Sequence, residues 1–323
     1  MNEKNNIDVV IAWVDGNDPK HRNKLQQFLK TEDRRSDDIS GSTRYASEGE
    51  IYYCVASVLR FAPFVRKIFI VTDNQNPDLD NFIQRNFSGN TVPVEIVDHK
   101  VLFGGYEQYL PTFNSLSIET CLFRIPDLSE NFVYFNDDCF LVRPLSYSDW
   151  YVQDSVVAIG NWRSIFFDSL LRLIKPRKNG RKPFGFKDSM LNAAQILDTR
   201  RSYFHIAHTP HPLKKSVLEQ YFTQHEDQLI ANISHKFRNE TQFNPQELFY
   251  LLMFKAQKCI RKPASRLLYM KPTGRRKGYI TRKLRQFETS NEILYCCIGS
   301  LDLACGKDRT KLLDWLKNIL LLN

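Results

Sequence analysis

The sequence predicts an α/β fold with a mostly parallel sheet and flanking helices. Four short runs are nearly continuous in apolar residues instead of alternating, which is typical of strands covered on both faces. Helical patterns lie between these runs, and such alternation favours a parallel sheet. A chain of 323 residues with 42% hydrophobic composition is large enough to bury this core in one domain, with or without a smaller appendage.

Each element of this fold has its own signal. A helix is predicted over 47–63, where five apolar residues share one face, and another over 115–128, with Ser115 as its N-cap. A third helix is predicted from Lys214 or Ser216 to Gln224. The four predicted strands are IDVVIAWV at 7–14, KIFIVT at 67–72, VEIVD at 94–98 and FVYFN at 132–136.

Acidic residues follow every predicted strand. In chain order they are Asp15 and Asp18, Asp73, Asp98, and the pair Asp137 and Asp138. Parallel strands end at one edge of a sheet, where open α/β sheets bind ligands. Clustered carboxylates repel one another without a cation, so the pattern favours Mg²⁺ or Mn²⁺ held against substrate phosphate. A lone Asp pair often caps a turn instead, and only the four strand ends together favour the metal site.

The positive charge of the chain is concentrated in two stretches. The formal net charge is +9, and neither 172–187 nor 255–285 contains an acid. Such stretches form either a solvated surface or a contact for a polyanion such as nucleic acid, anionic lipid or a phosphorylated polymer. The amphipathic end DRTKLLDWLKNILLLN packs on the core, dimerises or lies on a membrane surface.

Three histidines and one arginine are the remaining candidates for chemistry. His205, His208 and His211 are spaced by three, but Pro210 and Pro212 exclude one continuous helix and therefore disfavour a zinc cluster. Each histidine is a proton-transfer group, a phosphate ligand or a packed ring. Arg238, in a polar loop, forms either a surface ion pair or a bidentate phosphate clamp.

The cysteines and the N-terminus point to the cytoplasm. The seven cysteines are scattered without metal-binding spacing, which predicts reduced and mostly buried thiols. The start MNEKNNID has no apolar leader, and no apolar run approaches the roughly 20 residues of a membrane span. We therefore expect a cytoplasmic protein, either free or peripheral at the inner face of the membrane.

Four ordered blocks of the chain carry a family resemblance. They are IDVVIAWVDGNDP (7–19), RYASEGEIYYCVASVLRFAPFVRKIFIVTDNQNP (44–77), LPTFNSLSIETCLFRIPDLSENFVYFNDDCFLVRPL (110–145), and AHTPHPLKKSVLEQYF with SHKFRN (207–222 and 234–239). Spanning about 7–255, these blocks resemble the Stealth family, bacterial capsular polysaccharide phosphotransferases related to the animal N-acetylglucosamine-1-phosphotransferase. The long third block is the most specific.

The resemblance implies a reaction. In this family an acceptor hydroxyl attacks a nucleotide sugar, typically a UDP-N-acetylhexosamine, at the phosphorus bearing the sugar, and UMP leaves. A fold like that of Rossmann or GT-A nucleotide-sugar enzymes is expected. The implied site has three parts: catalytic Asp15, Asp138, His208 and Arg238; donor-binding Asp18, Glu50, Asp73 and Asn114; and the metal ligands Asp137 and Asp138.

The sequence departs from the family pattern in its second block. Tyr stands at 52–53 where Arg is common, and Ser47 stands where Asp is common, so the specificity for donor or acceptor differs if that Arg touches either. His211 remains an alternative to His208. The resemblance also implies a catalytic domain over 1–255, with a basic loop insertion at about 163–200, and a basic, helical extension over 256–323.

Other activities fit the same residue types. A metal-dependent glycosyltransferase, attacked at C1 and releasing UDP, needs the same parts, and only the resemblance favours phosphorus. A metal-dependent phosphoesterase or nuclease and a non-catalytic binding module are further alternatives. The expected partners are a UDP-sugar and an anionic glycan acceptor held by Arg275, Arg276 and Lys277, with peripheral membrane contact as an alternative role for these residues and no nucleic acid.

Overall fold

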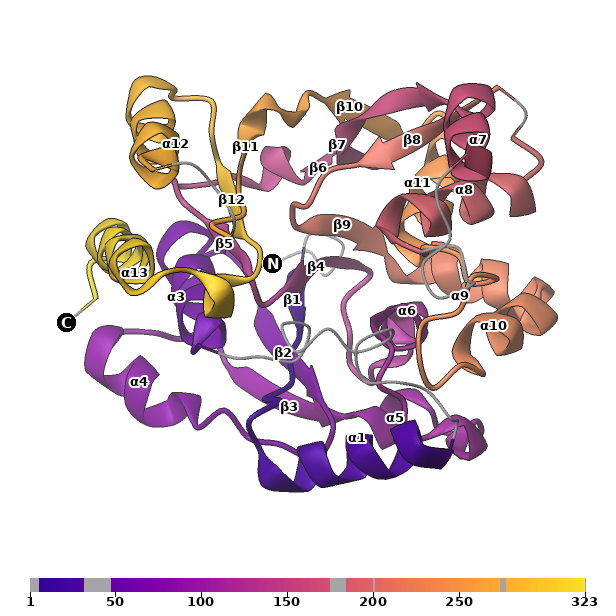
Figure 1. The fold of residues 1–323 in the computed structure, drawn as a ribbon, viewed down its shortest axis with the longest axis horizontal. Helices are drawn as coiled ribbons and strands as arrows, with labels where there is room; N and C mark the ends of the chain where they lie inside the picture. The colour runs from indigo at the N-terminus through magenta and orange to yellow at the C-terminus, as the bar shows by residue number, and fades with distance from the viewer. Residues whose placement is uncertain (1–5, 32–47, 175–183, 200, 274–276, 323) are drawn as a thin grey trace.

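The computed structural model describes residues 6–31, 48–174, 184–199, 201–273 and 277–322 (Figure 1). Its largest sheet has the order β3-β2-β1-β4-β9, in which the first four strands are parallel and β9 runs antiparallel to β4. The bounds are β1 (Ile7–Ala12), β2 (Lys67–Thr72), β3 (Val94–Asp98), β4 (Asn131–Asn136) and β9 (His211–Lys214). The strand order reverses between β1 and β4, which is where open sheets leave a ligand crevice.

The predicted strands are confirmed, and one of them is less buried than expected. The four predicted runs coincide with β1, β2, β3 and β4 to within two residues at each end. Strands β1, β2 and β4 are almost wholly buried. Strand β3, predicted to be covered on both faces, leaves Glu95 and Ile96 exposed because it forms the edge of the sheet with only β2 as its neighbour.

Helices in the first half lie against this sheet (Figure 1). The helix predicted over 115–128 is shorter than expected: it ends at Thr120 and continues as a 3₁₀ turn over 122–124. Pro126 cannot donate to a helical hydrogen bond and disfavours helical geometry just before it. The first-half helices are α1 (Pro19–Thr31), α3 (Glu50–Phe61), α4 (Leu79–Asn86), α5 (His99–Leu102) and α6 (Ser115–Thr120).

A second sheet and five helices form the middle of the chain. Strand β7 pairs with β6, β8 and β10, and only β10 runs parallel to it. The strands are β6 (Tyr151–Val152), β7 (Ser155–Ser164), β8 (Ser202–Ile206) and β10 (Cys259–Lys262). The helices are α7 (Ile165–Ile174), α8 (Phe186–Ile196), α9 (Lys215–Gln224), α10 (Glu226–Ile233) and α11 (Pro245–Lys255). The helix predicted to end at Gln224 is therefore confirmed.

The last part of the chain returns to the first. A third sheet has the order β11-β12-β5, with β5 (Cys139–Leu141), β11 (Leu267–Met270) and β12 (Tyr295–Ile298). The two late helices are α12 (Tyr279–Thr289) and α13 (Gly306–Leu320), and α13 packs on α3. The described part of residues 256–323, predicted to be helical, also contains the strands β10, β11 and β12. Strand β12 pairs with β5, which directly follows the Asp137–Asp138 turn.

Two whole-chain expectations concern thiols and membrane spans. All seven cysteines are free, and five of them are buried. Across the described ranges, no helix combines the length and the apolar character needed to cross a bilayer.

Candidate active site

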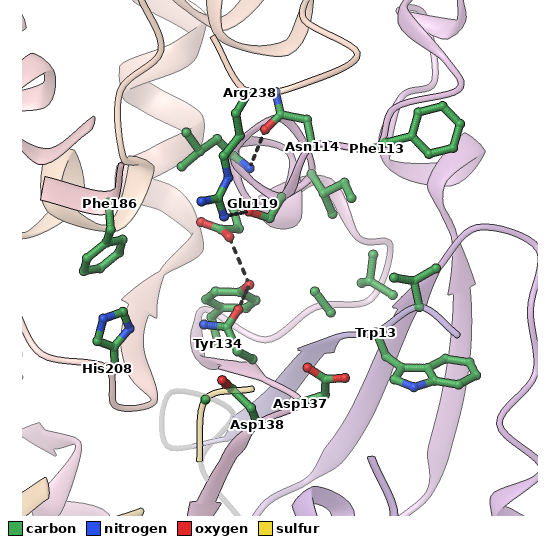
Figure 2. A pocket seen from close by; sticks show the side chains of 18 of the residues that line it. Trp13, Phe113, Asn114, Glu119, Tyr134, Asp137, Asp138, Phe186, His208 and Arg238 are labelled. Atoms are coloured by element: carbon green, nitrogen blue, oxygen red, sulfur yellow. Dashed lines mark hydrogen bonds between the residues drawn. The ribbon is translucent and has the colours of Figure 1, made fainter. Parts of the chain in front are cut away.

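A cavity of about 420 Å³ lies at the carboxyl ends of β1 and β4, where the strand order reverses (Figure 2). Its size suits a ligand larger than a simple ion. Its walls come from distant parts of the chain. They are residues 12–14 at the end of β1, residues 136–138 at the end of β4, α6, the β8–β9 connection, Arg238, and residues 298–302 at the end of β12.

Three carboxylates meet at the floor of this cavity. Glu50 is the first residue of α3, and Asp137 and Asp138 form the turn between β4 and β5. Burial raises the pKa of Asp137 well above its usual range, and the charges of Asp138 and Glu50 raise it further. Burial also raises the pKa values of Glu50 and Asp138. Among the residues that the structure describes, no lysine or arginine forms an ion pair with any of the three.

Carboxylates are the donors that a hard divalent cation prefers, although the oxygens of Glu50, Asp137 and Asp138 do not all lie within 4.8 Å of one another. Mg²⁺ and Mn²⁺ prefer carboxylate oxygens, and a bound cation would relieve the repulsion that raises these pKa values. Asp138 also lies with Cys139 and Cys297 in a group whose ligand atoms are within 4.8 Å of one another. A hydrogen bond with Cys297 lowers the pKa of Cys139, but burial and Asp138 raise it to about 11. Both thiols are therefore protonated and donate to the carboxylate of Asp138 at 3.6 Å, which leaves carboxylates as the ligands for a hard ion.

His208 stands at the side of the cavity as a neutral base. Its ring stacks between Phe186 and Tyr269, with centroids 4.6 Å and 5.3 Å away. Burial lowers its pKa below 6.5, while the nearby charge of Asp138 pulls the pKa upward. The imidazole is therefore unprotonated at neutral pH and close to the carboxylates, the condition that a proton acceptor requires.

The other two histidines have different surroundings. His211 also lines the cavity, but it is buried, its pKa is lowered to about 3, and its ring packs on Tyr134 and Tyr250. His205 lies on β8 and is not among the cavity residues. Within the described ranges, none of the three histidines belongs to a group of ligand atoms placed to hold a metal ion.

Arg238 faces the carboxylates from the opposite side (Figure 2). Its Nη2 donates to Ser115 Oγ at 2.8 Å, and its charge offsets part of the effect of burial, which raises the pKa of Glu119. Its Nε is buried with no hydrogen-bond partner among the described residues. An arginine fixed on one side and unsatisfied on the other suits an anionic ligand such as a phosphate.

Glu119 is a site residue that the sequence analysis missed. It accepts a hydrogen bond from Tyr134 at 3.2 Å, and Tyr134 also lies 2.7 Å from Asn136 Oδ1. A signal existed: Glu119 is an acid inside an otherwise apolar helical pattern, four residues after Ser115 and hence on the same face. This spacing places both residues beside Arg238.

Asn114 has a structural role at this edge. It, and not the predicted Ser115, caps α6, because its Oδ1 accepts from the Leu116 amide at 3.2 Å. Its amide group donates to His235 O and Gln242 Oε1. Asn114 lines the cavity, but these bonds occupy its polar atoms.

The remaining predicted acids lie outside the set of cavity residues. Asp18 accepts from the Lys20 amide at the start of α1 and from Gln75, which lowers its pKa. Asp15 accepts from the Asn17 amide at 2.8 Å. Asp73 pairs with Lys24 through both carboxylate oxygens, at 2.9 and 2.7 Å. These three carboxylates are satisfied by neighbouring parts of the chain.

The C-terminal segment completes the cavity. The Ile298 amide donates to Asp138 O at 3.0 Å, and residues 298–302 line the wall. No motif in the sequence predicted that residues 298–302 would line the cavity. Of the cations predicted to hold a polymer, Lys277 is exposed, and Arg275 and Arg276 lie outside the described residues.

Comparison with known proteins identifies the family. Conserved region 1 of the Stealth proteins matches residues 5–33, and conserved region 2 matches residues 44–159. These ranges contain the first three predicted blocks, while the fourth block, over 207–239, stays a prediction. Among solved structures, the galactosyltransferase LgtC aligns over 97% of this chain and 95% of its own, at 12% identity and a TM-score of 0.43, which is too weak to support an argument.

Curated relatives extend the match along the chain. The capsular polysaccharide phosphotransferase fcs1 of Haemophilus influenzae is 31% identical over 307 residues, covering 93% of this chain and 79% of that relative. The phosphotransferase cps1A of Actinobacillus pleuropneumoniae is 33% identical over 75% of this chain, and the chain spans only 63% of its length. The chain belongs to the Stealth family.

Proposed function

We propose that this protein transfers a sugar-1-phosphate group from a UDP-N-acetylhexosamine to a hydroxyl of an anionic surface glycan, releasing UMP in capsule biosynthesis. One observation carries the proposal: a single cavity places the buried Glu50 and the half-buried Asp137 and Asp138 opposite an arginine with an unsatisfied donor. The relatives named as capsular polysaccharide phosphotransferases favour phosphorus, and not sugar carbon, as the attacked atom.

Glu50, Asp137 and Asp138 are the residues that would hold Mg²⁺ or Mn²⁺. When bound, the ion supplies charge neutralisation to the diphosphate of the donor. Asp138 is kept in position by the thiols of Cys139 and Cys297 and by the Ile298 amide on its carbonyl oxygen. Asp15, Asp18 and Asp73 are proposed to shape the β1 and β2 loops around this group.

Arg238 binds the phosphoryl oxygens in this proposal. Ser115 and Glu119 fix the guanidinium from one side, and Arg238 lines the cavity in which the ligand would lie. Phosphoryl transfer depends on positioning and charge more than on covalent chemistry. A guanidinium held in place before the substrate arrives needs no reorganisation as charge develops.

His208 accepts the proton of the attacking hydroxyl. The acceptor oxygen forms a bond to the sugar-bearing phosphorus, the bond from that phosphorus to the bridging oxygen breaks, and UMP departs with the bonding electrons. The proton passes to the neutral imidazole, which stacks between Phe186 and Tyr269. A positioned base of this kind contributes roughly 10²–10⁴-fold.

The test measures UMP against UDP. Purified protein is incubated with Mg²⁺ or Mn²⁺, a panel of UDP-N-acetylhexosamines and a short phosphoglycan acceptor, and the nucleotides are separated by chromatography. Acceptor-dependent UMP supports the proposal. UDP indicates attack at C1 and a glycosyltransferase, and hydrolysis without acceptor indicates a phosphoesterase; either result rejects the proposal.

A further inference from the structure

Helix α7 presents its apolar side chains to solvent. Phe166, Phe167, Leu173 and Ile174 are each 65–70% exposed, and Leu170 is 47% exposed. Figure 1 shows α7 at the edge of the molecule beside α8. Single exposed apolar residues are ordinary, but a whole helical face of them marks a contact surface.

The one acid of this helix points the other way. Asp168 is 3% exposed, and it accepts from Arg163 Nε at 2.9 Å, from Lys187 and from Tyr203 at 2.7 Å. Burial raises the pKa of Asp168, but these three donors hold it down at about 2. The ion pairs therefore fix α7 with its one acid inward and its large apolar residues outward, the reverse of an ordinary surface helix.

Basic residues lie near the start of α7 and follow it in the sequence. The carbonyl of Arg201, an exposed residue, accepts from the Ile165 amide at the start of α7. Exposed Arg261 donates to Asn161, next to Trp162, which is 45% exposed. The sequence that follows α7, KPRKNGRKP at 175–183, adds five cations and no acid, although its placement is outside the described residues.

We propose that α7 docks the protein on an anionic lipid surface, with Phe166, Phe167, Leu170, Leu173 and Ile174 inserted among the headgroups. Aromatic and aliphatic residues bordered by Arg and Lys are the pattern of interfacial helices, and basic residues near such a helix gain energy from anionic lipid. The same charge argues against a second copy of the chain, since two cationic borders would repel. The inference does not depend on the proposed reaction.

Docking through α7 would hold the α8 wall of the cavity near the membrane surface. Helix α7 contacts α8, and Phe186, the first residue of α8, stacks on His208. An acceptor carried at the membrane would then meet the cavity at the side formed by Phe186. Helix α8 thus connects the exposed face of α7 to the cavity.

Vesicle flotation tests this inference on the full chain. The probes are vesicles of phosphatidylethanolamine with phosphatidylglycerol, and vesicles of phosphatidylcholine alone. The variant Phe166→Gln/Phe167→Gln/Ile174→Gln changes only exposed side chains of α7. The matched control Ile96→Gln/Val101→Gln/Leu321→Gln removes three exposed apolar residues elsewhere. Thermal unfolding confirms that both fold, and the single variant Leu173→Gln replaces the triple variant if the latter is unstable.

We expect the protein and the control to float with anionic vesicles and the α7 variant to bind at least about tenfold more weakly, with little binding of any form to neutral vesicles. Equal binding by all three forms would overturn the assignment to α7. Absence of vesicle binding by the unmodified protein would overturn the membrane proposal. Sedimentation analysis tests whether α7 instead contacts a second copy of the chain. If the unmodified protein is a dimer that does not bind vesicles, and the α7 variant is a monomer, a second copy is the partner and the membrane proposal is wrong.

Discussion

The acids at the β1–β2 side of the sheet differ from those at the β4 side. Asp18 and Asp73 have amide, glutamine or lysine donors, whereas Asp137 and Asp138 share a buried floor with Glu50 and no described Lys or Arg pairs with them. Position at a strand end is common to both groups. What distinguishes the second group is its raised pKa values, and carboxyl groups with raised pKa values in a cavity mark a place for chemistry.

The sharpest test of this contrast is Asp138→Asn. The substitution keeps shape but removes a charge from the floor, so we expect UMP release to fall by at least about 10³-fold, because several kcal/mol of charge stabilisation are involved. Stability should hold or rise, since one of three like charges disappears. Enzyme assay and thermal unfolding on the same preparation measure both. Activity within tenfold of the unmodified protein would refute the importance of this floor.

The second test replaces His208 by Gln and follows rate against pH. Burial lowers the pKa of His208 below 6.5, so the base form prevails at neutral pH, and the rate of the unmodified protein should fall only as pH drops through that lowered pKa. We expect roughly a 10²–10³-fold loss in the variant and a weaker acid dependence. His205→Gln, outside the cavity, is the matched control. An unchanged acid limb in His208→Gln would assign the base to another residue.

Arg238→Lys probes the opposite wall. Lysine keeps the charge but loses the planar fork that contacts Ser115, so we expect a loss of about 10²-fold in kcat/KM. Arg85→Lys, on the exposed end of α4, should change nothing. Steady-state kinetics over donor concentration measures the effect. If both lysine variants kept full activity, Arg238 would have only a structural role.

The smallest effect is expected at Asp73→Asn. Losing the pair with Lys24 should lower the free energy of unfolding by about 1 kcal/mol, or roughly 2 °C in Tm, with activity changed less than about threefold. Calorimetry and the UMP assay together decide the case. A large loss of activity with unchanged stability would show that Asp73 acts with Asp138 in the reaction, and the distinction between the two groups of acids would be wrong.

Periodicity and strand-end chemistry predicted the framework well. The strands, α3 and the turn carrying Asp137 and Asp138 follow from local apolar patterns, and parallel strands must end at one edge. These patterns did not predict which strand-end acids line the cavity and which pair with other residues. That difference depends on partners such as Lys24 and Gln75, which reach the carboxylates through tertiary packing that leaves no periodic trace.

The role of the last strands was equally hidden. Residues 256–323 carry positive charge and helical patterns, which suggest an appendage. The short strand β12 instead pairs with β5 and brings Cys297 to Asp138. A strand of four residues gives little signal in the sequence. Its pairing with β5 depends on tertiary packing, which local patterns do not predict.

The pairing of β12 with β5 has a consequence for the timing of synthesis. Cys297 follows Asp138 by 159 positions, so a ribosome adding about 5–20 residues per second makes the second roughly 10–30 s after the first. During that interval the nascent chain has its acidic turn but lacks the thiol and the wall that enclose it. The site is thus assembled only after Cys297 and the residues that follow β12 have been made, and a chain released before that point carries the carboxylates without the wall that encloses them.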